Sequence, residues 1–571
     1  MADLRTLLET RLATAFAALS PGADPVLRPS EHADYQANGA LALAKALGRP
    51  PRAVAEEIIT GATLDDLCAQ VAVSGPGFIN LTLRPEVIAS AADAIAADPR
   101  LGVPAAEHAP RVVVDYSHPN VAKEMHVGHL RTTIIGDALC RIHEFCGYTV
   151  VRENHIGDWG TPFGMLIEHL VDVGETAAAE ELSVGDLTSF YQHARASFEA
   201  DESFRERSRH RVVLLQSGDE ETLRLWHVLV HQSLRYFDEV YAKLGVLLTD
   251  DDVVGESFYN PALPLVVEEL RDKGLLVESE GALCVFPPGF VTRDGDPLPL
   301  IVQKSDGGFG YAATDLAAIR DRIGRIGADL VLYVVGAPQE QHLAMCFAVA
   351  EMAGWLQPGQ AEHISFGSVL GTDRKMLKTR AGQSVKLVHL LDEAVTRAET
   401  ALAERTSELG DAERAAVARA VGIGAVKYAD LSTERTRDYV FDWDRMLAFE
   451  GNTGPYLQYA HARICSILRR AGGEPLEGAL VLSADEERSL ALCLAGFPTA
   501  VESARRDRSP SRLTNHLYEL ASTFTTFYET CPVLRAEDPA TRASRLRLCA
   551  ITATTLRCGL QLLGIEAPAR M

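Results

Sequence analysis

Cysteine pairs are missing from the sequence. The ten cysteines are scattered from Cys68 to Cys558, and none of them belongs to a CxxC pair. This spacing argues against a zinc knuckle and gives no sign of a secreted disulfide framework. We therefore expect most of these thiols to be buried as small hydrophobic side chains.

Long apolar runs are also missing. No uncharged, purely apolar run approaches the roughly 18 residues that a membrane span needs. The N-terminal segment alternates apolar and charged positions, as in Leu4, Arg5 and Leu7, which predicts an amphipathic helix without the apolar core of a signal peptide. Asp3 and Glu9 argue against a transit peptide. The sequence thus predicts a cytoplasmic protein without a membrane segment.

The sequence has fewer positively charged residues than negatively charged ones. Lysine and arginine number 55 against 78 aspartates and glutamates, which gives a net charge of −23. A nucleic-acid partner would therefore have to bind through a local basic patch and not through the overall field. One candidate patch is the arginine-rich segment 501–571, which includes Arg505, Arg506, Arg508 and Arg512. For any single arginine, a solvated helix face remains the simpler interpretation.

The 571 residues are enough for two to four domains. Residues 1–105 resemble a small α/β unit with a helix over Leu4–Leu19 and a strand over Gly75–Leu83. The segment 106–391 contains two β-branched runs, Val112–Val114 and Val331–Val335, each followed by a helical pattern, and these favour a doubly wound α/β domain. A charged helical insertion is expected at about 175–250. Residues 392–571 are helical in pattern.

The most informative motif follows the first buried strand. In VVVDYSHPNVAKEMHVGHLRTTII, the strand leads through a loop into a helix whose entrance holds His126, Gly128 and His129. Ligands bind at this edge of open α/β sheets, and a helix N-terminus there attracts phosphate. Two imidazoles at that entrance could donate hydrogen bonds to a phosphate during nucleotidyl transfer. Helix-capping histidines or half of a metal site are the alternatives.

A second motif is the basic segment RKMLKTRAGQSVK, which contains Lys375, Lys378 and Arg380. A compact cationic loop of this kind suits the β- and γ-phosphates of ATP. An ordinary solvated basic loop is the alternative interpretation.

Together, HVGH and KMLKT resemble the paired signatures of class I aminoacyl-tRNA synthetases. The segments ENHIGDWGTPFGML, TRAGQSVKL and DYVFDWDRMLAFEGNTGPYLQYAHARI narrow the resemblance to the arginine-specific branch, over nearly the whole chain. The resemblance implies a Rossmann-like catalytic domain over 106–391, an N-terminal tRNA-contacting domain over 1–105 and an all-α anticodon-binding domain over 392–571. It also implies tRNA(Arg), L-arginine and ATP as substrates, Mg²⁺ with the nucleotide, and a monomer.

The same resemblance assigns site residues. It implies that four residues are catalytic, namely His126, His129, Lys375 and Lys378. The arginine-binding positions that it implies are Asp115, Asn120, His129, Tyr311, Asp315 and Gln339, with Asp315 on the guanidinium. For ATP it implies Lys123, His126, Gly128, His129, Gly336, His342, Val369, Lys375 and Lys378. No residue is assigned to a metal that the protein itself holds.

Three rival interpretations stay open. The chain could be a class I synthetase for another amino acid, a paralogue that binds tRNA without catalysis, or a paralogue that serves a specialised or resistance pathway. The presence of both signatures, HVGH and KMLKT, argues against a paralogue without catalytic activity. Three features depart from the pattern: His118 stands where small residues are common in the family, Pro162 stands where glutamine is frequent, and the Met-Leu pair in KMLKT differs from the class consensus.

Overall fold

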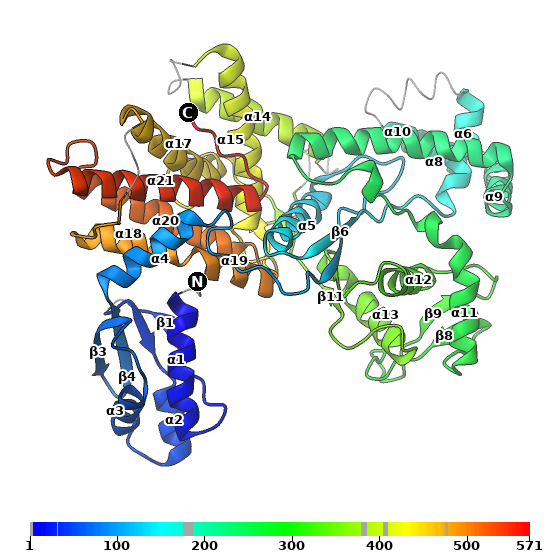
Figure 1. Cartoon of the computed structure of the whole chain (residues 1–571). Helices are drawn as coiled ribbons and strands as arrows, with labels where there is room; N and C mark the ends of the chain where they lie inside the picture. The colour runs from blue at the N-terminus through cyan, green and yellow to red at the C-terminus, as the bar shows by residue number, and fades with distance from the viewer. Residues whose placement is uncertain (1–3, 31, 175–186, 378–384, 404–408, 474–477) are drawn as a thin grey trace.

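The computed structural model describes residues 4–30, 32–174, 187–377, 385–403, 409–473 and 478–571. Three regions follow one another along the chain (Figure 1): a small N-terminal unit, a central region built on a parallel sheet, and a bundle of helices. Within the described residues, no helix combines the length and the apolar character needed to cross a membrane.

The N-terminal unit is an antiparallel sheet with helices against it. Its sheet has the order β1-β2-β4-β3. The helix predicted over Leu4–Leu19 is confirmed with these bounds, whereas the strand predicted from Gly75 begins at Phe78, because Gly75 and Gly77 have positive φ and form a turn. The elements are α1 (Leu4–Leu19), β1 (Leu27–Pro29), β2 (Tyr35–Ala37), α2 (Ala40–Leu47), α3 (Pro51–Gly61), β3 (Cys68–Ser74), β4 (Phe78–Leu83) and α4 (Pro85–Ala97).

The central region is built on a four-stranded parallel sheet in the order β11-β10-β5-β6. The two predicted strands lie in its middle, and Val112, Val113 and Val114 are fully buried there. The outer two strands are shorter or more polar and were not predicted. The elements are β5 (Arg111–Asp115), α5 (Val127–Phe145), β6 (Thr149–Glu153), α12 (Tyr311–Gly324), β10 (Leu330–Tyr333), η3 (Ala337–Gln339), α13 (Glu340–Met352) and β11 (Ala361–His363).

Two insertions separate β6 from α12. The first is helical, as predicted, although residues 175–186 of the predicted range lie outside the described part of the chain. The second contains a small antiparallel sheet in the order β7-β8-β9, which the sequence analysis did not predict. Their elements are α6 (Pro162–Val173), α8 (Leu187–Ala200), α9 (Glu202–Ser217), α10 (Glu220–Leu244), η1 (Asp250–Asp252), η2 (Glu256–Ala262), α11 (Leu263–Asp272), β7 (Val277–Ser279), β8 (Ala282–Val285) and β9 (Leu300–Gln303).

The C-terminal region is a helical bundle that includes a short strand pair. Strand β12 pairs in parallel with β13, 70 residues further along the chain. The first helix starts at Leu387, a few residues before the predicted boundary at 392. The elements are β12 (Val369–Leu370), α14 (Leu387–Ala403), α15 (Asp411–Leu431), β13 (Tyr439–Val440), α16 (Trp443–Met446), α17 (Gly454–Arg470), α18 (Asp485–Ala495), α19 (Phe497–Arg506), α20 (Ser511–Thr530) and α21 (Pro539–Leu562).

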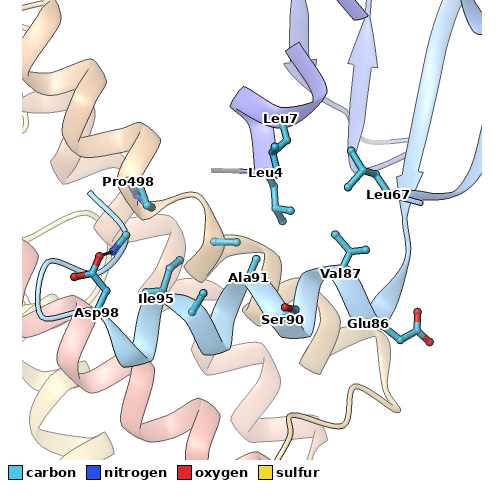
Figure 2. A pocket seen from close by; sticks show the side chains of 13 residues that line it. Leu4, Leu7, Leu67, Glu86, Val87, Ser90, Ala91, Ile95, Asp98 and Pro498 are labelled. Carbon is cyan, nitrogen blue, oxygen red and sulfur yellow. Dashed lines mark hydrogen bonds between the residues drawn. The ribbon is translucent and has the colours of Figure 1, made fainter. Parts of the chain in front are cut away.

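A cleft of about 320 Å³ lies where the N-terminal unit meets the helical bundle. Figure 2 shows Leu4 and Leu7 of α1 on one side and Val87 and Ala91 of α4 on the other, with Pro498 of α19 nearby. Its lining is mainly apolar and includes none of the predicted site residues. This cleft is therefore a seam between units and offers no chemistry for the predicted reaction.

A buried ion pair fastens α5 to the helical bundle. Nε of Arg131 lies 3.1 Å from Oδ2 of Asp430, and both side chains are almost fully buried. Arg131 also donates to the backbone carbonyl of Arg437, 2.9 Å away, and its guanidinium lies over the ring of Tyr439. One side chain thus ties the helix of the first motif to α15 and to the strand that pairs with β12.

We expect Arg131→Met and Asp430→Leu each to destabilise the protein by about 3–5 kcal/mol, because each leaves a buried charge without its partner. The double variant should lose much less stability than the sum of the losses in the two single variants. Urea unfolding followed by fluorescence measures these differences. The exposed pair Arg195–Glu199 on α8 serves as a control, since breaking it should cost less than about 1 kcal/mol. Additive losses for Arg131 and Asp430 would contradict the coupling.

Candidate active site

The candidate site lies where the strand order of the sheet reverses. Strand β5 leads through α5 to β6 on one side, and β10 leads through α13 to β11 on the other. Asp115 and Tyr333 are paired at the carboxyl ends of β5 and β10. Loops that leave such neighbouring strands in opposite directions open a crevice between them, and ligands bind there in open α/β sheets.

His126 and His129 cap the N-terminus of α5 and hold each other in place. The backbone N–H of Gly128 donates to Nδ1 of His126 at 3.0 Å, and the backbone N–H of His126 donates to Nδ1 of His129 at 3.1 Å. The two ring centroids are 4.1 Å apart. This reciprocal cap starts the helix at Val127, at the entrance that the sequence predicted.

Both imidazoles are held neutral. Burial, with a smaller effect of the charge on Lys123, lowers the pKa of His126. Burial, followed by the charges of His126 and His118, lowers the pKa of His129 to about 3. Because each Nδ1 accepts a hydrogen bond, the single proton of each neutral ring must be on Nε2. The pair therefore offers two N–H donors at a helix N-terminus, which is the arrangement that a developing phosphate charge requires.

Gly128 serves the histidine pair itself. A Cβ at this position would lie 2.7 Å from Cε1 of His126. The resemblance assigns Gly128 to ATP, and the protein group nearest to its missing side chain is the imidazole of His126. Its small size is required to keep that ring in place.

The loop between β5 and α5 is strained and is held by the insertion. Ser117, His118 and Ala122 all have positive φ, at 82°, 54° and 58°. Each such non-glycine residue costs on the order of 1 kcal/mol or more. Two side chains of α10 hold the loop: the hydroxyl of Tyr241 lies 2.8 Å from that of Ser117, and Ser233 accepts from the backbone N–H of Ala122 at 2.9 Å. The insertion therefore shapes the crevice.

Asp115 is buried with both carboxylate oxygens occupied. Oδ1 lies 2.7 Å from Nε2 of His118, and Oδ2 lies 2.9 Å from the guanidinium of Arg322. Burial opposes ionisation of Asp115, but the charges of Arg322 and His118 outweigh it and hold its pKa well below the usual range. Arg322 also donates to Glu153 at 2.6 Å. A ligand amine that reached Asp115 would have to share it with His118.

Asp315 is the more accessible carboxylate. Its side chain is 26% exposed, and its Oδ2 lies 2.5 Å from Nε2 of His342 on α13. The hydrogen bond to Asp315 raises the pKa of His342. Tyr311 is the first residue of α12, the helix that also carries Asp315. Its side chain is 76% exposed, so it does not enclose a slot for a guanidinium.

The remaining predicted residues surround the same strand ends. Asn120 is exposed and forms an isolated bridge with Gly157, where a Cβ would lie 2.4 Å from the Asn120 side-chain oxygen. Gln339 is exposed on η3, directly before α13. Gly336, which follows β10, forms an isolated parallel bridge with Phe366, which follows β11. Val369 is buried in the core, so its side chain can only support the wall.

The basic loop lies beside the histidine pair. Residues 370–376 form a tight turn in which Gly371 donates to the carbonyl of Lys375 at 2.8 Å, and the side chain of Lys375 is exposed. Lys378 and Arg380 lie outside the described residues. The chain then returns to α5, where Val127 donates to the carbonyl of Val385 and Leu387 to that of Met125. The C-terminal end of the loop is thus anchored next to its predicted partner motif, whereas its N-terminal end continues β12, which pairs with β13. Lys123 is also exposed, with its ammonium 4.6 Å from the centre of the Tyr191 ring.

The predicted basic patch is largely neutralised within the protein. Arg505 pairs with Glu502, Arg508 pairs with Glu362, and Arg506 and Arg512 both pair with Asp507. The simpler interpretation of these arginines as ordinary surface charges fits these contacts, although Arg506 and Arg512 remain more than half exposed.

Arg322 and Glu256 belong to the site but were not predicted. Arg322 lies two turns after Asp315 on α12, and a charged residue in an otherwise apolar helix face was the available signal. Glu256 begins η2, after the helical insertion that follows β6, and no local pattern marks it. Burial and the charges of Asp158 and Asp315 raise the pKa of Glu256 to about 7.

Comparisons with known families agree with this architecture. Residues 92–443 match the family model described as tRNA synthetases class I (R), catalytic domain. Residues 2–83 match the arginyl tRNA synthetase N terminal domain, and residues 457–571 match the DALR anticodon binding domain. The fold and the paired motifs therefore define a class I tRNA synthetase.

Individual relatives narrow the assignment. The chain is 54% identical to an arginine–tRNA ligase of Thermobifida fusca, with both chains covered completely. It is 49% identical to that of Synechococcus elongatus, over 100% of this chain and 99% of the relative. The crystal structure of the arginyl-tRNA synthetase from Plasmodium falciparum superposes with a TM-score of 0.87 at 30% identity, with full coverage of both chains. The chain belongs to the arginyl-tRNA synthetase family.

We expect Gly128→Ala to displace the His126 ring, because the new Cβ would overlap it. This displacement of the ring should reduce the rate of the catalysed reaction by about 100-fold with little loss of thermal stability. Single-turnover kinetics and thermal unfolding measure the two effects. Gly324→Ala, at a position with open space on α12, is the matched control. Full activity of Gly128→Ala would contradict the role given to the histidine pair.

Proposed function

We propose that the crevice at the ends of β5 and β10 joins arginine to ATP and then passes the arginyl group to tRNA(Arg). The carboxylate of arginine attacks the α-phosphate, pyrophosphate leaves, and arginyl-adenylate forms. The terminal adenosine hydroxyl of the tRNA next attacks the acyl carbon, and AMP leaves. The observation that carries this proposal is the pair of neutral, Nε2-protonated histidines at the N-terminus of α5, beside the anchored basic loop.

The catalytic roles follow from charge. His126 and His129 donate to the α-phosphate as its charge develops. Lys375 and Lys378 hold the β- and γ-phosphates, and Lys123 adds positive charge near the same phosphates. The backbone at Gly128, Gly336 and Val369 forms the walls around the nucleotide. His342 contributes to the nucleotide side and at the same time orients Asp315.

Asp315 is proposed as the partner of the guanidinium. A guanidinium is permanently charged and carries five donors, so its pocket needs an accessible carboxylate. Asp315 is partly exposed, whereas Asp115 is already bound by Arg322 and His118. Asp115, Asn120 and Gln339 are assigned to the amino and carboxylate ends of the substrate. Tyr311 would have to turn inward when arginine binds.

Mg²⁺ is expected to arrive with the nucleotide. The one compact group of potential metal ligands among the described residues contains a thiol and an imidazole, whereas Mg²⁺ prefers oxygen ligands. Phosphate oxygens and water would therefore supply most of its coordination, and the ion would screen the phosphates.

The wider assignments are part of the same proposal. The N-terminal unit, residues 1–105, contacts tRNA, and the helices of 392–571 bind the anticodon stem and loop. The family models support this division, although the catalytic one extends to residue 443. We further propose that the protein acts as a monomer in the cytoplasm, which light scattering of the purified protein would test for the oligomeric state.

The purified protein with ATP, Mg²⁺ and total tRNA should attach radiolabelled arginine and should leave lysine, glutamine and cysteine uncharged. A hydrogen-bonding pocket rejects substrates that leave its polar groups unpaired by factors of about 10⁴ or more. Charging with another amino acid would overturn the substrate assignment. Binding of tRNA without any charging would favour a non-catalytic paralogue.

Asp315→Asn should lower kcat/KM for arginine by at least about 30-fold, since it removes one member of a charge pair worth roughly 2 kcal/mol or more. The KM for ATP should change little. Steady-state aminoacylation at varied arginine and at varied ATP concentration separates the effect on arginine from the effect on ATP. Asp321→Asn, on the same helix but paired with Arg325 near the surface, is the control. An unchanged arginine KM in Asp315→Asn would remove Asp315 from the guanidinium site.

A further inference from the structure

Three side chains of different chemistry converge beside the proposed arginine pocket. Asp315 comes from α12, and His342 and Cys346 lie one turn apart on α13. Their ligand atoms, a carboxylate oxygen, an imidazole nitrogen and a sulfur, all lie within 4.8 Å of one another. It is the one such group found in the described ranges. The proposed reaction uses the carboxylate and the imidazole but gives the thiol no role.

One distance within the group matches that of a tetrahedral zinc site, and a second can reach it by a small movement. Ligand atoms of such a site are separated by about 3.3–3.6 Å, as follows from metal–ligand bonds of about 2.0–2.3 Å. Nε2 of His342 lies 3.6 Å from Sγ of Cys346, which already matches. Nε2 of His342 lies 2.5 Å from Oδ2 of Asp315, so a metal would separate these two atoms by about 1 Å. Rotation of one partly exposed side chain is sufficient for that.

The group is closed on one side and open on the other. Cys346 is fully buried, whereas the side chains of His342 and Asp315 are 30% and 26% exposed. An ion can therefore enter from the exposed side, and water can occupy a fourth position. Three protein ligands with one open position are typical of zinc sites that exchange with solvent.

The thiol is unlike a redox-reactive cysteine. Burial, with the charge of Asp315 as a smaller cause, raises the pKa of Cys346 well above its usual value. A buried, protonated thiol is a poor nucleophile, so oxidation or modification is disfavoured. The positive charge of a bound metal ion stabilises the thiolate, so on coordination the thiol releases its proton to solvent.

We propose that Asp315, His342 and Cys346 form an inhibitory site for a thiophilic divalent cation such as Zn²⁺, which competes with arginine for Asp315. The competition rests on the proposed function, in which Asp315 binds the guanidinium. The metal site itself does not. With Zn²⁺ bound, the carboxylate is occupied, and the added positive charge repels a cationic substrate.

The test begins with metal binding to the metal-free, reduced full-length protein in the absence of ATP. Addition of Co²⁺ should produce a thiolate-to-cobalt charge-transfer band in the wild type. The band should be lost in Cys346→Ala and in Cys346→Ser and retained in Cys549→Ala, another fully buried cysteine, which lies on α21. Thermal unfolding confirms that each variant is folded. Absence of the band in the wild type, or its persistence in folded Cys346 variants, would overturn the metal site.

Aminoacylation at a fixed excess of Mg²⁺ over ATP then tests the consequence. Zn²⁺ should inhibit the wild type, higher arginine should relieve the inhibition, and Cys346→Ala should raise the inhibition constant by at least about tenfold. If Co²⁺ binds through Cys346 but arginine does not relieve inhibition by Zn²⁺, the metal site stands and the assignment of Asp315 to the guanidinium fails. The two failures are therefore distinguishable.

Discussion

The candidate site depends on how firmly α5 is buried. Fourteen of the 19 residues of this helix are buried, and the helix packs against β5, β6 and four helices of the bundle, α14, α15, α19 and α21. The ion pair between Arg131 and Asp430 adds a charged link inside this packing. The two imidazoles at its N-terminus are thus placed by contacts from both the parallel sheet and the helical bundle. A movement of the bundle relative to the sheet would have to repack α5, which physically connects the helical bundle to the two imidazoles.

Burial acts in opposite ways on the charged groups of the crevice. It keeps His126 and His129 neutral, which makes them hydrogen-bond donors of defined tautomer. Asp115 remains ionised only because Arg322 and His118 compensate for its burial. Asp315 is the more accessible carboxylate, and it is therefore the one proposed to meet a cationic substrate or a competing metal ion. In the proposed mechanism, groups that stabilise charge in the nucleotide are thus different from groups that bind charge in the amino acid.

The first insertion has a structural role at the site. The loop after β5 contains three non-glycine residues with positive φ, and α10 holds it through Ser233 and Tyr241. Backbone strain of this kind persists only where surrounding contacts determine the conformation. The insertion is therefore part of the framework that presents His118 and Asn120 to the crevice, although it contributes no proposed catalytic group.

The two central strands, the helix Leu4–Leu19 and both signature motifs could be predicted from the sequence, because they depend on local periodicity and on residues close together in the chain. The partners of the charged and metal-ligating side chains could not. The pairing of Arg322 with Asp115, the approach of Glu256 to Asp315, and the meeting of Asp315 with Cys346 join residues from separate elements, and no local pattern encodes such distances. Tertiary structure also decided that the clustered C-terminal arginines pair with acidic neighbours, because charge balance on a surface depends on what the fold places beside each side chain.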